Sequence, residues 1–180
     1  PHNLHVNAVV TSGGDTVDVP AAADFPTTLD VVLAGSGGFT KTGVGTLQIT
    51  QPATITGPLT ITKGVVQIGP GGSLTPSSVS ISTSQQLRVA GGTFTTPGNV
   101  TWNSGTGTGI IVSAGTGDFQ RILPSNTRNS FVRVTGGTFS ATEIKFPRSG
   151  DSESQALAAG VQISGGDSTV GTIGLGTDNS

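Results

Sequence analysis

The chain has 180 residues, a net charge of −2 at pH 7 and no cysteine, and only 10% of its residues are charged. So small a charge excludes electrostatic recognition of nucleic acid or of an anionic membrane surface. No stretch approaches the roughly 20 apolar residues of a membrane-spanning helix, and the lack of cysteine excludes disulfides and thiolate metal sites. We therefore expect one domain over residues 1–180, with no nucleic-acid partner, no membrane insertion and no cofactor.

Apolar residues alternate with polar ones in short segments, and this pattern predicts β-strands with one buried face. Two strands are expected at residues 4–10 and 29–33. Six more begin at Leu47, Val65, Leu87, Ile110, Val132 and Val161. Successive starts in this series lie 18, 22, 23, 22 and 29 residues apart. Steps of this length are typical of repeat proteins, whose units span roughly 20–50 residues.

The internal repeat is visible in the letters of the sequence. LRVAGGTF at residues 87–94 and VRVTGGTF at 132–139 are identical at six of eight positions. VQISGGD at 161–167 is a third copy, and VQIGPGGSL at 66–74 is a looser fourth. Each copy is an alternating strand followed by a glycine pair, which favours a corner because glycine adopts positive φ at little steric cost. The predicted corner residues are Gly71, Gly72, Gly91, Gly92, Gly136, Gly137, Gly165 and Gly166.

A step near 22 residues with glycine-rich corners fits one coil of a β-helix, in which each coil pairs in parallel with the next. A hairpin sandwich would instead show turn signals about every 8–12 residues and no such long-range identity. The sequence therefore predicts an all-β, right-handed parallel β-helix (β-solenoid) of about six to eight coils. Residues 149–160 lengthen the last step and are expected to form a loop insertion, or one helical turn, that bulges from the coil.

The segment GGFTKTGVGTLQIT at residues 37–50 resembles the autotransporter-associated β-strand repeat, whose pattern is G-G-hydrophobic-T-K-x-G-x-G-T-L-x-L. The second half of that repeat is matched less closely by TGPLTITKGVVQI at 56–68, where Val65 replaces the usual Thr. QPATITG at 51–57 stands in place of the usual N-T-Y-S-G. The resemblance implies a passenger-like β-helix on, or released from, a bacterial cell surface. It transfers no catalytic residue.

Three residues are weak candidates for a ligand site. Trp102, the only tryptophan, would stack on a sugar if exposed, but a buried position at the end of a strand is the interpretation that we favour. Asp118 and Arg121, together with Arg128 and Arg133, form a concentration of charge. Arg88 and Arg133 share one position of the repeat. These charges form either a strip for acidic surface glycans or outward positions on a solvated face.

Other polar groups are interpreted as surface features. Four charged residues around the predicted insertion are expected to keep an exposed loop solvated: Lys145, Arg148, Asp151 and Glu153. His2 and His5 are too few for a zinc site, which needs about four ligands. SGGD at 12–15 and at 164–167 lacks the tandem glycine-aspartate repeat of calcium-binding β-rolls, so we expect ordinary turns there. We predict no catalytic, cofactor or metal site.

These observations favour a non-catalytic structural or adhesive module of a bacterial cell-surface or secreted protein. The chain starts at Pro1 without an initiator Met, and we expect it to be a piece of a longer protein. The two open ends of a solenoid favour head-to-tail assembly into fibres. One alternative is a carbohydrate-binding or polysaccharide-degrading β-helix. A third function is ice binding through outward Thr rows such as LTIT at 59–62, against which the irregular spacing of Thr along the chain argues.

Overall fold

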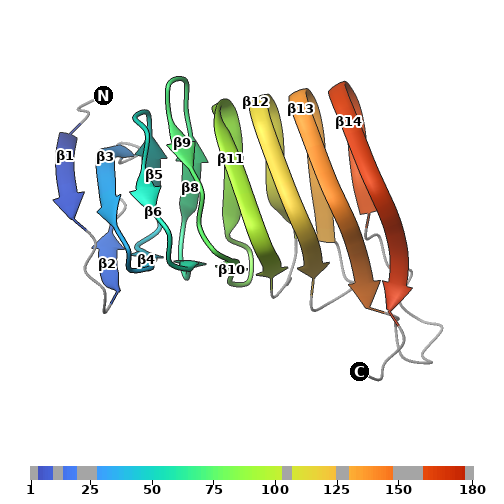
Figure 1. Cartoon of the computed structure of the whole chain (residues 1–180), viewed down its shortest axis with the longest axis horizontal. Helices are drawn as coiled ribbons and strands as arrows, with labels where there is room; N and C mark the ends of the chain where they lie inside the picture. The colour runs from blue at the N-terminus through green and yellow to red at the C-terminus, as the bar shows by residue number, and fades with distance from the viewer. Residues whose placement is uncertain are drawn as a thin grey trace.

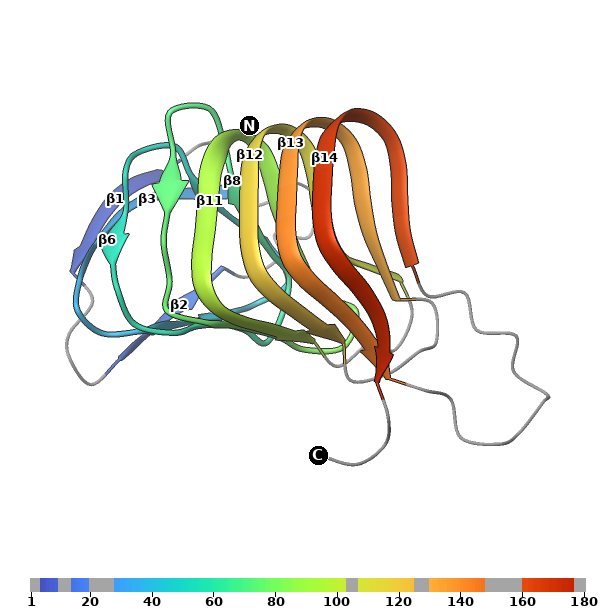
Figure 2. The same ribbon diagram turned by 45° about the vertical axis from the view of Figure 1, so that its right-hand side comes forward.

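The computed structural model describes residues 4–9, 14–19, 28–102, 107–124, 130–147 and 160–176. Over these residues the protein is all-β and has no helix, hence no helix that could span a membrane. The strands wind into a parallel β-solenoid of about five turns, with the N-terminal strands at one end and the C-terminal strand at the other (Figures 1 and 2). The predictions of an all-β parallel β-solenoid and of its repeats are thus confirmed.

The strands are short in the N-terminal half of the chain and long and bent in the C-terminal half. The short ones are β1 (Leu4–Val9), β2 (Asp15–Asp18), β3 (Thr28–Gly35), β4 (Phe39–Thr42), β5 (Thr46–Ile49), β6 (Thr54–Ile55), β7 (Leu59–Ile61), β8 (Val65–Ile68), β9 (Ser73–Leu74) and β10 (Val79–Ile81). The long ones are β11 (Gln86–Trp102), β12 (Gly107–Pro124), β13 (Ser130–Pro147) and β14 (Gly160–Gly176). The predicted insertion at 149–160 lies outside the described residues, apart from the first residue of β14.

The solenoid has three faces, and each long strand contributes to all of them. The first part of β11 pairs with β8, its middle with β9 and its last part with β10. The first face therefore stacks β1, β3, β5 and β8 on the first parts of the long strands. The second face contains β6, β9 and their middle parts. The third contains β2, β4, β7, β10 and their last parts.

Inward side chains of successive coils form continuous columns in the core. In the first face the column consists of Leu47, Val66, Leu87, Ile110 and Val132, all with no exposed surface. The sequence placed Val65 in this series, and that alignment is wrong by one residue. Val65 is the first residue of β8, but it pairs with Thr46 and is half-buried. The register partner of Leu47 is Val66, so the step is 19 residues, one more than the chosen strand starts imply.

The second face contains an aromatic stack in which one coil contributes its ring from a neighbouring position of the strand. Phe94 and Phe139 occupy the same column, as the repeat predicts, but Gly117 lies between them. The ring that separates them belongs to Phe119, whose centroid lies 5.3 Å from that of Phe94 and 5.5 Å from that of Phe139. A Cβ atom on Gly117 would lie 2.9 Å from the Phe119 ring. The glycine thus provides the space that the displaced ring fills.

Removal of that ring is expected to destabilise the coil strongly. Phe119→Ala leaves a cavity between two rings and should lower the free energy of unfolding by about 3–5 kcal/mol. Ile111→Ala, on the outward side of the same strand, should cost less than about 1.5 kcal/mol because little buried volume is lost there. Urea denaturation of both variants measures the difference. Similar losses for the two would contradict the packing described for Phe119.

Candidate functional site

Asp118 and Arg121, from the predicted concentration of charge, each contact a residue of the next coil. Asp118 accepts a hydrogen bond from Ser140 Oγ at 2.6 Å through its Oδ1. Arg121 Nε donates to Glu143 Oε2 at 2.6 Å, which makes an ion pair. Both contacts join direct register partners on β12 and β13. Sequence reasoning missed Ser140 and Glu143, although each follows its partner by the 22-residue coil length.

These contacts leave little free chemistry at the candidate site. The Arg121 and Glu143 side chains are 41% and 30% exposed, and an ion pair in that setting contributes only about 0.2–1 kcal/mol. Because Glu143 already holds the guanidinium, Arg121 is not a free cation for a glycan. The arrangement fits lateral support between coils better than substrate binding.

Trp102 ends β11 inside the core. Its side chain is 3% exposed, and its register partners on either side are Ile81 and Pro124. A Cβ atom on Gly109 would lie 3.0 Å from the indole, so this glycine leaves room for the ring. Trp102 therefore presents no ring face to solvent on which a sugar could stack.

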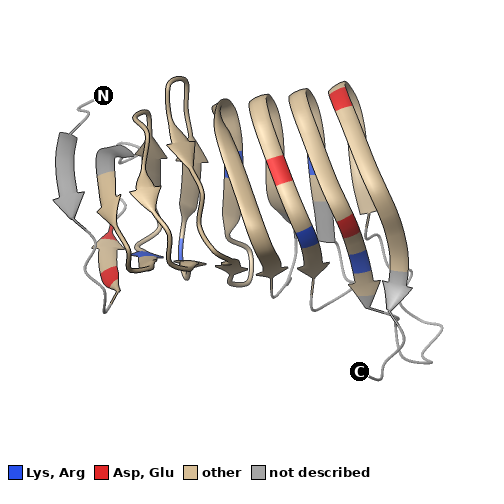
Figure 3. Ribbon diagram, in the orientation of Figure 1, with Lys and Arg blue, Asp and Glu red and all other residues tan. Residues whose placement is uncertain are grey.

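The arginines of the common repeat position lie in one outward column but not side by side. Ile111 separates Arg88 from Arg133. Each guanidinium donates two hydrogen bonds to the side-chain oxygen of a glutamine. Arg88 donates to Gln86 Oε1 at 2.6 and 2.9 Å, and Arg133 donates to Gln162 Oε1 at 3.2 and 3.3 Å. Figure 3 shows that charged residues are few and spread over the described coils rather than gathered in a basic strip.

The remaining polar candidates are only partly within the described residues. Lys145 lies on β13, whereas Arg148, Asp151 and Glu153 lie outside the described part, as does His2. His5 belongs to β1, and the SGGD segments contribute Asp15 to β2 and Asp167 to β14. Among the described residues no group of three or more His, Asp or Glu side chains could hold a metal ion.

The predicted glycine pairs have two distinct geometric properties. One member of each has a positive φ, at Gly71 (80°), Gly91 (124°), Gly137 (76°) and Gly166 (78°). The other member is closely packed: a Cβ atom would lie 2.1–2.6 Å from a backbone oxygen of the preceding coil at Gly72, Gly92, Gly136 and Gly165. At Gly137 and Gly166 both properties coincide, because a Cβ atom there would also lie 2.5 and 2.3 Å from a backbone oxygen of the preceding coil. Each pair thus supplies a backbone angle that favours glycine and a close approach of two coils.

A buried lysine organises the corner that follows β4. Lys41 has no exposed surface and occupies the inward column directly beside Ile61. Its Nζ donates to the carbonyl oxygens of Thr42 (2.5 Å), Gly43 (2.6 Å) and Lys63 (3.1 Å). The ammonium thus fastens the corner of one coil to the corner of the next. The burial of Lys41 could have been inferred from the sequence, because Lys41 follows the inward Phe39 by two residues in the same alternating strand.

Burial lowers the pKa of Lys41 from 10.5 to about 8, and the nearby carboxylate of Asp18 acts in the opposite direction. Desolvation penalises the charged amine, and the three carbonyl contacts compensate it only in part. Lys41 is thus a structural cation whose charge is costly to keep inside the coil.

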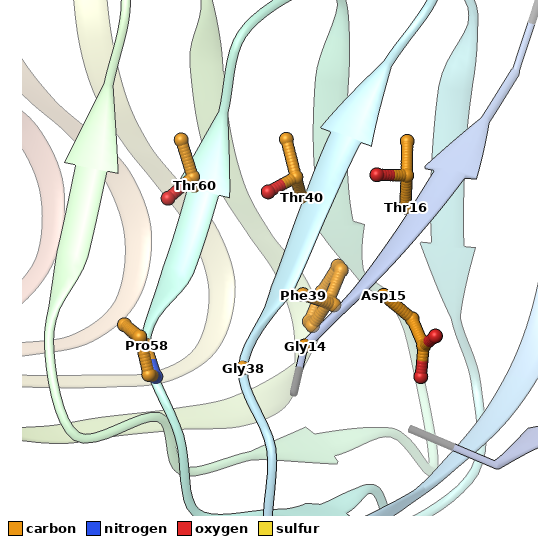
Figure 4. Close-up of a pocket in the computed structure, with 8 residues that line it drawn as sticks. All are labelled: Gly14, Asp15, Thr16, Gly38, Phe39, Thr40, Pro58 and Thr60. Atoms are coloured by element: carbon orange, nitrogen blue, oxygen red, sulfur yellow. The ribbon is translucent and has the colours of Figure 1, made fainter. Parts of the chain in front are cut away.

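A shallow hollow of about 460 Å³ lies on the third face, where β2, β4 and β7 begin (Figure 4). It is lined by Gly14, Asp15, Thr16, Gly38, Phe39, Thr40, Pro58 and Thr60. Its three threonines come from three adjacent strands, and their side chains lie in a row. Without a cluster of titratable groups, the hollow offers hydroxyl groups but no acid–base pair.

Crowding at the Lys41 corner gives a mutational prediction. Gly64 has a φ of 78°, and a Cβ atom there would lie 2.3 Å from the Gly45 oxygen and 2.9 Å from Lys41 Nζ. Gly64→Ala should therefore lower the unfolding free energy by more than about 1 kcal/mol. Gly174→Ala is the matched control, because a Cβ atom there meets nothing within 4 Å. Equal effects in thermal melts would contradict the described corner.

The lowered pKa of Lys41 makes its contribution to stability depend on pH. Between about pH 8 and 10.5 the unfolded chain binds more protons at this lysine than the folded one, so the free energy of unfolding rises with pH. Wild-type stability should therefore increase relative to Lys41→Met as the pH is raised from 8 to 10. Denaturant titrations at several pH values measure this difference. A constant or falling difference would contradict the burial of the charge.

Comparison of the chain with known proteins gives no relative from which a function could be transferred. No protein-family model, curated protein or solved structure matches it.

Proposed function

We propose that the chain is a non-catalytic structural or adhesive module of a bacterial cell-surface or secreted protein that assembles end to end. The observation that carries this proposal is the state of the last coil. Ile163 and Ile173 on β14 are 53% and 60% exposed. Their register partners on β13, Val134 and Ile144, have no exposed surface. Within the described residues the core columns therefore continue to β14, where these two isoleucines are exposed.

A further layer with matching columns would bury these isoleucines. The β14 backbone has a strand partner only on its β13 side among the described residues, so its other edge is free to form a parallel ladder. Repetition of a contact between unlike ends produces an open filament when the rotation does not close. The partner in this proposal is thus another copy of the chain.

The finer features of the fold belong to the same proposal. We infer a right-handed coil, because strand connections within parallel sheets are right-handed in about 98% of cases. We also propose a total of about six to eight coils, with β1, β3 and β14 counted among their layers. The motif at residues 37–50 supports an extracellular location through its resemblance to passenger repeats.

The alternative of a carbohydrate-binding or polysaccharide-degrading protein has less support. The contacts of Asp118 and Arg121 are made within the coil, and Trp102 is buried. Binding of acidic glycans that is lost in Arg121→Ala would nevertheless favour it over the structural proposal.

The assembly proposal predicts a specific mutational effect. The wild-type chain should form concentration-dependent oligomers in sedimentation velocity and fibres in electron micrographs. Ile163→Lys combined with Ile173→Lys should abolish both, because two charges would then have to be buried against the next copy. Val44→Lys is the matched control: Val44 is 63% exposed but lies at a side corner. A wild-type chain that stays monomeric at high concentration, or an equal effect of the control, would contradict the proposal.

A further inference from the structure

The outward side of the third face carries a row of hydroxyl groups, one from each of five successive layers. The row consists of Thr16, Thr40, Thr60, Ser80 and Thr101, on β2, β4, β7, β10 and β11. Each is the direct register partner of the next. The irregular spacing of threonine along the chain had argued against such a row. Unequal corner lengths account for the irregularity, and the register removes it in space.

A second row runs beside the first, two residues further along each strand. It starts at Asp18 on β2 and continues with Thr42, Thr62 and Ser82. The ladder between the later members runs through Thr62 N to Lys41 O (3.0 Å) and Ser82 N to Ile61 O (2.8 Å). Adjacent strands are about 4.8 Å apart, and residues i and i+2 of a strand about 6.6 Å. The two rows therefore form a two-dimensional grid of hydroxyl groups with these repeats.

The grid is held in a fixed arrangement. Threonine is branched at Cβ, which restricts χ1, and the hydroxyl groups of Thr16, Thr40 and Thr60 point to the same side in Figure 4. In the second row Thr42 donates to Asp18 Oδ1 (2.7 Å) and Thr62 to Lys41 O (2.9 Å). Within the described part of the chain, no hydrogen bond uses the side chains of the first four members of the first row. Their hydroxyl groups are thus available to an external partner.

The chemistry of this surface indicates what that partner is. Asp18, at the β2 end of the second row, is the one charged side chain in the two rows, and it accepts the hydrogen bond from Thr42. The hydroxyl positions themselves are uncharged, so they are complementary to a neutral surface. Every aromatic side chain whose burial the structure describes is buried, which removes the stacking platforms that a sugar would use. What remains is a rigid, periodic array of hydroxyl and methyl groups, and its repeats are similar to those of the water molecules on a face of ice.

We propose that the two hydroxyl rows form an ice-binding face. Threonine hydroxyl groups held at lattice spacing would take the places of water molecules in the ice surface, and the methyl groups between them would pack against the lattice. The preorganised array loses little conformational entropy on binding. This inference concerns a side face and is independent of the end-to-end assembly through β14.

The first test uses the wild-type chain. We expect a fluorescently labelled sample to adsorb to a growing ice crystal and to produce thermal hysteresis, with a labelled protein that does not bind ice as the reference. Exclusion of the chain from the ice together with no hysteresis would overturn the proposal.

The second test locates the surface. Thr40→Lys and Thr60→Lys should each cause loss of most of the hysteresis and of ice adsorption, because a long charged side chain keeps the grid away from the lattice. Gln67→Lys, an outward position on the first face, introduces the same group elsewhere and should retain both. Ser80→Lys, at an exposed position of the row, replaces any threonine variant that fails a thermal-melt control. Unchanged hysteresis in the row variants, or equal loss in Gln67→Lys, would overturn the proposal.

Discussion

The structure depends on the parallel backbone register that joins each coil to the next. Because neighbouring strands lie about 4.8 Å apart, each residue sits directly on its equivalent in the coil below, and inward positions must be filled jointly by adjacent coils. The buried column from Leu47 to Val132 shows the ordinary solution, in which aliphatic side chains stack on one another. The same constraint requires glycine wherever two coils approach too closely for a Cβ atom. Gly72 is an example, since its Cβ atom would collide with the backbone oxygen of Ile49.

Two local exceptions show how firmly the register is kept. Gly117 and Phe119 exchange the small and large positions of their coil, yet the aromatic stack from Phe94 to Phe139 stays continuous. Lys41 occupies an apolar column, and its ammonium is accommodated because three carbonyl oxygens of two successive corners surround it. Both exceptions are compensated within one or two coils, and the pairing of β11 with β12 shifts its register by one residue between Thr96 and Asn99, beside Phe119. Local compensation of this kind is expected in a solenoid, where each repeat contacts only its neighbours.

The β-solenoid and its repeat could be predicted from the sequence because inward alternation and glycine pairs recur at nearly constant steps. The alignment of Val65 was wrong because strand starts reveal the period but not the length of each corner. The partners of Asp118 and Arg121 follow from adding one coil length, whereas the ring of Phe119 does not, since it leaves its own column. The hydroxyl row was obscured for the same reason as Val65: corners of unequal length disturb spacing along the chain but not register between strands. Function is harder to predict from the sequence, because the hydroxyl row and the exposed isoleucines of β14 form surfaces and not a reaction centre.

The register itself is the most direct object of a test, and the absence of cysteine from the chain allows an unambiguous one. The pair Thr60→Cys and Ser80→Cys replaces outward register partners on β7 and β10, which lie close enough for a disulfide after small adjustments. The pair Thr60→Cys and Ser78→Cys is displaced by two residues, because Ser78 directly precedes β10. Under mild oxidation, followed by mass spectrometry, the account predicts rapid intramolecular cross-linking of the first pair and much slower cross-linking of the second. Equal rates, or faster cross-linking of the displaced pair, would contradict the stacked register.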